Sequence, residues 1–118
     1  MLPVFSKLQF FLYREPTDMR RGFDGLSGLV SSYLKQDVLS GDVFVFINRR
    51  RNRIKLLVWD GDGFWLFYKR LEKGTFQLPT NTNQQLSIRL SYDELLMIIQ
   101  GLDLSSVKRR LRYHRQLN

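Results

Sequence analysis

Two short stretches of this chain concentrate positive charge, and neither of them contains an acidic residue. They cover residues 49–55 and 108–115 and hold ten of the nineteen lysines and arginines. The other nine basic residues are matched by eleven acidic ones, so the formal net charge of +8 comes from these two stretches. Clustered lysine and arginine indicates a polyanionic partner, most often a nucleic acid. The predicted DNA-contacting residues are Arg49, Arg50, Arg51, Arg53, Lys55, Lys108, Arg109, Arg110, Arg112 and Arg115, with Arg20, Arg21, Lys69 and Arg70 as secondary candidates.

The two basic stretches predict different kinds of contact. Residues 49–53 fit a hairpin loop between two apolar runs, and on a protruding loop their side chains could straddle a groove and neutralise phosphates. A solvated, solubilising loop is the alternative. The stretch 108–115 fits an arm that follows a phosphate backbone, and equally a helix C-terminus, where the dipole favours cations. His114 stands alone there and is interpreted as a bystander.

Asp60, Asp62 and Glu72 are the carboxylates that could hold a metal ion, as in a metal-dependent nuclease. An EF-hand calcium loop starting at Asp60 would need glutamate at position 71, which is leucine here. A tight Asp-Gly-Asp-Gly turn explains the two aspartates without any chemistry. A single histidine and no cysteine leave no credible catalytic set. The sequence therefore predicts no metal, no cofactor, no catalytic residues and no enzymatic activity.

The length and composition predict one domain with a tail. A chain of 118 residues with 43% hydrophobic content can bury a core. We expect a single α+β domain over residues 1–107 and a basic C-terminal tail over residues 108–118. The absence of cysteine excludes disulfides and thiolate metal sites. No run reaches the length of a membrane span and no signal peptide is apparent, so we expect a cytoplasmic protein with no membrane contact.

A strand over residues 8–13 and a long helix are predicted first along the chain. Thr17 or Asp18 fits the helix N-cap. The apolar spacing of Met19, Phe23, Leu26, Val30 and Tyr33 predicts one buried helical face. The three glycines beside that face indicate either a closely packed neighbouring backbone or a slightly frayed helix: Gly22, Gly25 and Gly28.

A three-stranded antiparallel meander is predicted over residues 43–47, 54–59 and 64–71. Further short strands are expected at 73–79 and at the sheet edge, 88–90. A capping box at Ser91–Glu94 opens a helix that ends near Gly101, and 102–111 is expected to form a second short helix. The fold class is therefore α+β: an antiparallel meander with additional edge strands packed against one long helix, plus a C-terminal helical segment.

Both faces of the meander are apolar, and one helix covers only one face of a sheet. The second face is therefore expected to meet the C-terminal helix, another subunit or a partner. The aromatic side chains on these strands could stack on exposed bases, although a core or dimer seam is the better interpretation. They are Trp59, Trp65, Phe67 and Tyr68.

Four segments, in this order and spacing, resemble a known family. They are Pro16–Leu26, Val45–Leu57, Trp59–Trp65 and Tyr68–Gly74, and the run LSYDELLMIIQGLDL extends the likeness toward the C-terminus. Together they resemble the short accessory protein called TnpB of insertion-sequence family sixty-six, the Orf-two-like proteins. The resemblance implies a bacterial mobile-element protein required alongside a separate transposase, which carries the strand-transfer chemistry. No catalytic residue is carried over from it.

Three functions follow as hypotheses. The leading one is an accessory protein of insertion-sequence transposition that binds DNA through its basic segments and assists a separate transposase, nucleoid-associated when bound to DNA. The alternative is a protein–protein adaptor that docks the transposase through the second apolar face without touching DNA. The third is a metal-dependent nuclease using Asp60, Asp62 and Glu72. The expected partners are DNA, the transposase of the same element and a second copy in a homodimer.

Overall fold

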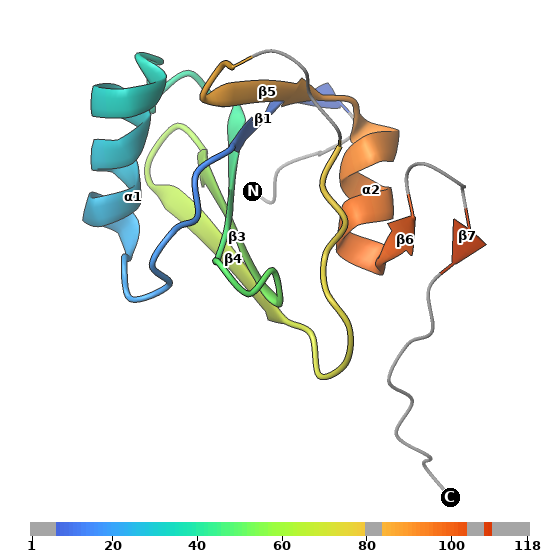
Figure 1. Ribbon diagram of the computed structural model, residues 1–118. Coiled ribbons are helices and arrows are strands. Elements are labelled where there is room, and N and C mark those ends of the chain that lie inside the picture. Colours follow the sequence, from blue (N-terminus) through green and yellow to red (C-terminus); the bar gives the residue numbers. More distant parts are fainter. Residues whose placement is uncertain (1–6, 80–83, 104–107, 110–118) are drawn as a thin grey trace, which may run out of the picture.

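A five-stranded mixed sheet lies between two helical layers in the computed structural model (Figure 1). The structure describes residues 7–79, 84–103 and 108–109. The sheet order is β4-β3-β2-β1-β5. The strands are β1 (Phe10–Tyr13), β2 (Val43–Ile47), β3 (Arg53–Trp59), β4 (Phe64–Arg70) and β5 (Ser87–Leu90). The helices are α1 (Phe23–Leu29), which continues into the π-helical η2 (Val30–Leu34), and α2 (Tyr92–Gln100). The α+β fold class is therefore confirmed.

The predicted meander is formed by β2, β3 and β4, all paired antiparallel. Every residue of β2 is buried, as expected for a continuous run of valine, phenylalanine and isoleucine. The turn into β4 is tight: the Asp60 N–H donates to the Gly63 carbonyl at 2.8 Å, and Gly61 has φ +80°. Glycine is the residue that adopts such a φ without steric cost, so the local sequence dictates this turn.

Strand β1 occupies an interior position of the sheet that its sequence does not reveal. It pairs parallel with β2 and antiparallel with the edge strand β5. A parallel pair needs a long crossover, and residues 14–42, including α1 and η2, provide it. The crossover therefore places α1 on one face of the sheet. The edge strand predicted at residues 88–90 is confirmed by β5.

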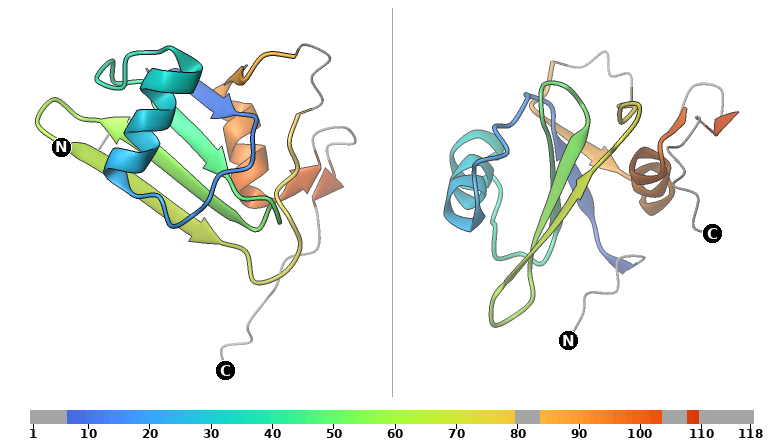
Figure 2. Two further views of the ribbon diagram at one scale, coloured as in Figure 1. Left: turned by 60° about the vertical axis from the view of Figure 1, so that its left-hand side comes forward. Right: turned by 90° about the horizontal axis from the view of Figure 1, so that it is seen from below.

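The alternating residues of the strands form two cores, one on each face of the sheet. The core under α1 and η2 contains Tyr13, Leu26, Leu29, Val30, Leu34, Phe44, Phe46 and Leu57. The core under α2 contains Phe10, Leu12, Val43, Val45, Ile47, Ile54, Leu56, Val58, Phe76, Leu90, Leu95 and Ile98. Figure 2 shows the two helices on opposite sides of the sheet. The second apolar face of the meander thus meets the C-terminal helix, one of the three options open from the sequence.

The predicted start of the first helix is wrong. The helix begins at Phe23, with Gly22 at the N-cap and no side-chain cap hydrogen bond. Asp18 closes a turn instead, because its Oδ1 accepts the backbone N–H of Arg20 at 2.9 Å. Thr17 is buried, and its backbone N–H donates to the Ile47 carbonyl at 2.9 Å. The segment before the helix is thereby tied to the end of β2.

Two residues of the predicted buried stripe, Phe23 and Tyr33, are 47% and 58% exposed. A π turn holds one more residue than an α turn, so the position four residues after Val30 comes onto the buried side. Leu34 is buried accordingly, while Tyr33 points outward. A Cβ added at Gly22 or at Gly28 would meet nothing within 4 Å, so of the two alternatives the closely packed neighbouring backbone does not apply at these two glycines.

The capping box of the second helix is confirmed. The Ser91 Oγ accepts the Glu94 N–H at 3.1 Å, and the Glu94 Oε1 accepts the Ser91 N–H at 2.9 Å. Gly101 ends α2 with φ +74°. None of the helices among the described residues has both the length and the apolar composition needed to cross a lipid bilayer.

Two elements predicted near the C-terminal half are wrong. Residues 102–103 and 108–109 pair antiparallel as two short strands, β6 (Leu102–Asp103) and β7 (Lys108–Arg109), where a helix was expected. The described segment 73–79 contains no strand, although its Phe76 is fully buried. The side chain of Phe76, with the partly buried Leu78 beside it, anchors this segment to the core without forming a strand.

Candidate nucleic-acid interface

The hairpin between β2 and β3 is closed by two asparagines. The Oδ1 of Asn48 accepts the backbone N–H groups of Asn52 at 3.0 Å and Arg53 at 2.9 Å. The Nδ2 of Asn48 donates to the Oδ1 of Asn52 at 2.7 Å. Arg51 has φ +57°, a left-handed conformation that costs a residue with a Cβ about 1–2 kcal/mol. The loop therefore has a specific shape, which holds its arginines in fixed backbone positions.

Neighbouring segments brace this hairpin from two sides. The N–H of Phe76 donates to the Arg51 carbonyl at 2.6 Å, and the N–H of Leu71 donates to the Asn52 carbonyl at 2.8 Å. On the other side, the bond from Thr17 to Ile47 holds the segment that leads to α1. The tip is accordingly a braced rim of the sheet, not the protruding loop expected from the sequence.

An open cleft of about 570 Å³ lies between the hairpin tip and the segment before α1. Two of the segments that carry the family resemblance, far apart in the chain, thus line one surface. The lining residues are Pro16, Thr17, Asp18, Met19, Arg20, Asn48, Arg49, Arg50, Asn52 and Arg53. A second hollow of about 300 Å³ adjoins it and is lined by Arg53, Tyr68, Arg70 and Glu72. Arg53 belongs to both, so the basic surface is continuous.

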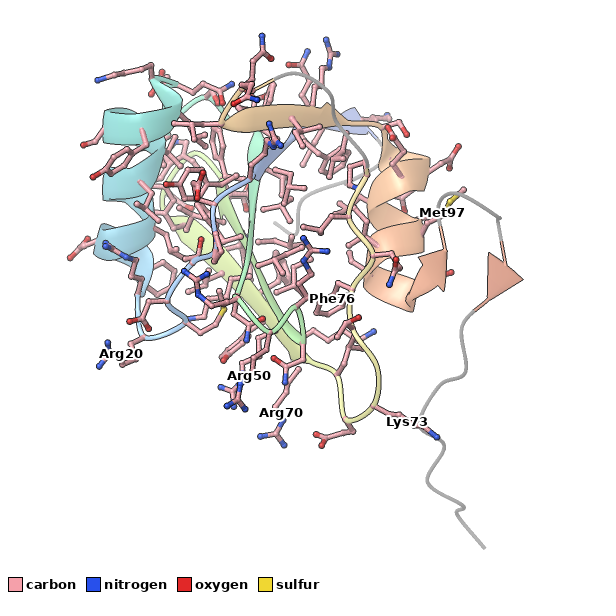
Figure 3. The ribbon with its side chains drawn as sticks, viewed as in Figure 1. Arg20, Arg50, Arg70, Lys73, Phe76 and Met97 are labelled. Atoms are coloured by element: carbon pink, nitrogen blue, oxygen red, sulfur yellow. The ribbon has the colours of Figure 1, made fainter. Side chains whose placement is uncertain are left out.

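We call this surface the basic end and define it by six arginines. Figure 3 shows three of them, Arg20, Arg50 and Arg70, projecting from the same end of the molecule. With the described residues, the side chains of the three consecutive arginines at the tip form no hydrogen bond or ion pair. The basic end consists of five arginines that line the two hollows, Arg20, Arg49, Arg50, Arg53 and Arg70, and of the exposed tip residue Arg51.

Two carboxylates partly neutralise the basic end. The Asp18 carboxylate accepts from Arg20, with 2.6 Å between Oδ2 and Nη2, although the Arg20 side chain is 91% exposed. This hydrogen bond, together with the backbone N–H of Arg20, lowers the pKa of Asp18 to about 2. Glu72 pairs with Arg70 at 2.8 Å. The Nη1 of Arg53 donates to the Tyr68 hydroxyl at 2.8 Å.

Lys55 is not available as a phosphate contact, so its place among the predicted DNA-contacting residues is corrected. Its side chain is buried and its Nζ donates to the carbonyls of Met19 at 2.7 Å and Arg21 at 2.8 Å. The ammonium also lies 4.7 Å from the centroid of the Tyr68 ring. Lys55 is therefore a positioning residue: it joins the segment that carries Arg20 to the sheet.

Replacing Lys55 by methionine is expected to destabilise the fold by about 1.5–3 kcal/mol, because two carbonyls lose a charged donor while the apolar stem is kept. The measurement is the free energy of unfolding in urea. Lys69→Met is the matched control, because Lys69 is exposed and its ammonium donates to one carbonyl, that of Ile99, at 2.9 Å. Equal stability of the two variants would show that the Lys55 ammonium does not hold this segment.

The remaining predicted positions fall in different places. Lys69 donates to α2 on the opposite face of the sheet from Tyr68, so it is separate from the basic end. Arg21 is exposed, and its carbonyl is one of the two acceptors of Lys55. Lys108 and Arg109 form β7, and the other predicted tail residues, Arg110, Arg112 and Arg115, lie outside the described residues.

The sequence did not predict that two asparagines shape the hairpin tip. Asn48 and Asn52 flank the three tip arginines, and asparagine tolerates tight turns and hydrogen-bonds to nearby backbone. An asparagine on each side of the three arginines was the sequence signal from which a tight, side-chain-bonded turn could have been predicted.

The three carboxylates considered for a metal do not meet. Asp60 lies in the turn before β4, where its Oδ2 accepts the indole N–H of Trp65 at 2.9 Å. Glu72 follows the other end of β4, a strand of seven residues that spans about 20 Å. No group of three potential ligands among the described residues could hold a metal ion. The Asp60–Gly63 segment is explained by its role as a turn.

Comparison with known proteins identifies the family. The model of the IS66 Orf2-like proteins matches residues 8–109. Two uncharacterized proteins of Sinorhizobium fredii are similar over 103 residues: y4jC is 39% identical, over 87% of this chain and 86% of its own length, and y4hO is 35% identical, over 87% and 88%. No solved structure matches. These matches confirm the resemblance seen in the four segments, and the chain belongs to the IS66 Orf2-like family of transposition-associated accessory proteins.

Proposed function

We propose that this protein binds DNA through its basic end and assists the transposase of the same insertion sequence. The observation that carries the proposal is the joining of two family segments in one cleft, with exposed arginines on both of its sides. Five arginines and two carboxylates line the two hollows, and the exposed Arg51 lies beside them at the tip, which leaves this surface strongly positive. Such a surface attracts a polyanion and releases its counterions on binding.

The braced shape of the tip favours phosphate contacts over insertion into a groove. Phosphate contacts position a protein on DNA but carry no direct sequence information. Because the hairpin is held by the Asn48 side chain and by the backbone N–H groups of Phe76 and Leu71, which donate to its carbonyls, its backbone needs little ordering on binding. The basic tail, with Lys108 to Arg115, supplies further phosphate contacts in this proposal.

Replacing Asp18 by asparagine tests the proposed role of the cleft. The variant removes one negative charge and releases Arg20 from its ion pair, while the amide oxygen can still accept the Arg20 N–H. We expect tighter binding to duplex DNA and a salt dependence steeper by about one phosphate contact. The charge-matched control is Asp62→Asn, in the turn before β4 and away from the cleft. An identical gain in both variants would contradict a specific role for the cleft.

The pH dependence of Asp18 has a defined direction. Its pKa in the folded protein, about 2, lies below the ordinary value of 3.8. The stabilisation by its ion pair is therefore complete above about pH 5 and is lost as the pH falls from about 4 toward 2. The Asp18→Asn variant is expected to lack this part of the acid titration of stability, and the carboxylate stays charged throughout the neutral range used for DNA binding.

The adaptor function remains the second candidate, because the family is tied to transposition and the sheet keeps some apolar surface. Helix α2 covers most of the second face, and a groove of about 220 Å³ is left beside β4, lined mainly by Ile54, Leu56, Phe67 and Ile99. A direct partnership with the transposase predicts that the two proteins co-purify after nuclease treatment and at high salt. Loss of the complex under those conditions would leave DNA as the link between them.

A further inference from the structure

Strand β4 is an edge of the sheet that is suited to pairing with another strand. Among the described residues it has a hydrogen-bonded neighbour, β3, on one side only. It contains seven residues and no proline: five apolar or aromatic side chains, FWLFY, are followed by Lys69 and Arg70. Trp65 and Tyr68 are 37% and 50% exposed. A long apolar edge strand without proline is a template for strand addition.

The outward-facing backbone groups of β4 follow from its pairing with β3. In an antiparallel pair, hydrogen-bonded and non-hydrogen-bonded positions alternate. The flanking bonds, Asp60 to Gly63 and Leu71 to Asn52, fix which positions bond to β3. The alternate residues therefore direct their N–H and C=O groups away from β3. They are Phe64, Leu66, Tyr68 and Arg70.

We propose that two copies of this chain pair antiparallel through β4, with Phe67 on the twofold axis. In this register Leu66 lies opposite Tyr68 of the partner subunit. Lys69 lies opposite Trp65 of the partner subunit, and Arg70 lies opposite Phe64 of the partner subunit. The outward-facing residues then bond one another across the axis, and the same surface serves both subunits.

Charge placement selects this arrangement over its alternatives. Lys69 and Arg70 both lie at one end of β4, so a parallel pairing would set like charges beside one another. The antiparallel pairing separates these cations and places each against an aromatic ring of the other copy, an attractive contact. The opposite edge, β5, has four residues against seven in β4, so it offers fewer backbone groups for strand addition.

The pairing has a consequence that rests on the proposed function. Because Arg70 is at one end of β4 and the two strands run in opposite directions, the basic ends of the two copies face opposite ends of the dimer. The dimer therefore presents two DNA-contacting surfaces, which could hold two duplex segments at once. Pairing through β4 does not itself require DNA.

The test is a disulfide that forms only in the proposed register. The chain has no cysteine, so Phe67→Cys introduces a single thiol. Position 67 falls on a non-hydrogen-bonded pair, where Cα atoms lie about 4.5 Å apart, within the range that a disulfide spans. We expect a covalent dimer after mild oxidation that reverts to monomer on reduction. Arg89→Cys, on the other edge, is the control and is expected to stay monomeric.

Sedimentation of the unmodified chain, without DNA, measures dimer formation directly. Its result does not depend on whether the cysteine variants fold. A species of twice 14.1 kDa that increases with protein concentration is expected. A monomer at every concentration would overturn the proposal, and so would equal cross-linking of the two cysteine variants. Efficient cross-linking through a cysteine at Leu66 instead of at Phe67 would overturn the register. None of these measurements depends on DNA binding. A failure of the dimer proposal is therefore distinguishable from a failure of the proposed DNA binding.

Discussion

Removing the three consecutive tip arginines is expected to weaken DNA binding about 500-fold at 0.1 M salt. The variant is Arg49→Ala/Arg50→Ala/Arg51→Gly, with glycine at position 51 because φ there is +57° and the tip should keep its shape. Each lost phosphate contact lowers the slope of log affinity against log salt by about 0.9, so three lower it by about 2.7. With equal affinities of the variant and the unmodified chain at 1 M salt, a slope difference of about 2.7 over the tenfold decrease to 0.1 M salt gives a loss of about 500-fold in affinity. The measurement is the affinity for a labelled duplex across a salt series.

A charge-matched control separates the location of the charge from its amount. Lys7→Gln/Lys35→Asn/Arg89→Gln also removes three positive charges, at exposed positions outside the cleft. Asparagine is used at position 35 because φ there is +55°, which asparagine tolerates. This control is expected to change the slope much less. If both triple variants lose affinity equally, the protein attracts DNA through its net charge and not through the basic end.

Phe76→Ala is expected to cost about 3–5 kcal/mol of folding free energy, a large share of the 5–15 kcal/mol typical of a domain. Phe76 is fully buried in the core under α2 and is the main anchor of a segment without regular structure, with Leu78 packed only partly against the same core. Its backbone N–H also supports the hairpin tip through the Arg51 carbonyl. The effect is measured from the midpoint and slope of urea unfolding.

Gln77→Ala is the neighbouring control for Phe76, because Gln77 is only partly buried and is expected to change stability by less than about 0.5 kcal/mol. Phe76→Leu, which keeps most of the apolar volume, should fall between the two. A cost below about 1 kcal/mol for Phe76→Ala would mean that the segment 73–79 is not anchored in the core by this side chain.

The parts of the fold with strong local signals were predictable from the sequence. The meander follows from apolar runs separated by the Asp-Gly-Asp-Gly turn, and the start of α2 follows from the Ser91–Glu94 capping box. The register of the first helix was not predictable, because the apolar stripe from Met19 assumed α-helical spacing throughout. The π turn at Val30–Leu34 brings Leu34 inward, and the segment before the helix is held by Lys55 instead of by a cap.

The candidate site was predictable as a set of charges but not as a surface. The sequence identified the arginines at residues 49–53, since their clustering is visible without coordinates. It also assigned Lys55 to them, because a lysine beside four arginines gives no sign of burial until the strand alternation places it under Met19 and Arg21. That Arg20 faces the same cleft depends on the crossover from β1 to β2, a long-range arrangement without a local signal.

The most direct test of the account is the binding of the purified chain to a labelled duplex of its element end, and to a scrambled duplex, across a salt series. We predict binding to both at low salt, with affinity that falls steeply as salt rises, because phosphate contacts from the basic end provide most of the free energy. Absence of binding at low salt would contradict DNA contact as the function of the basic end.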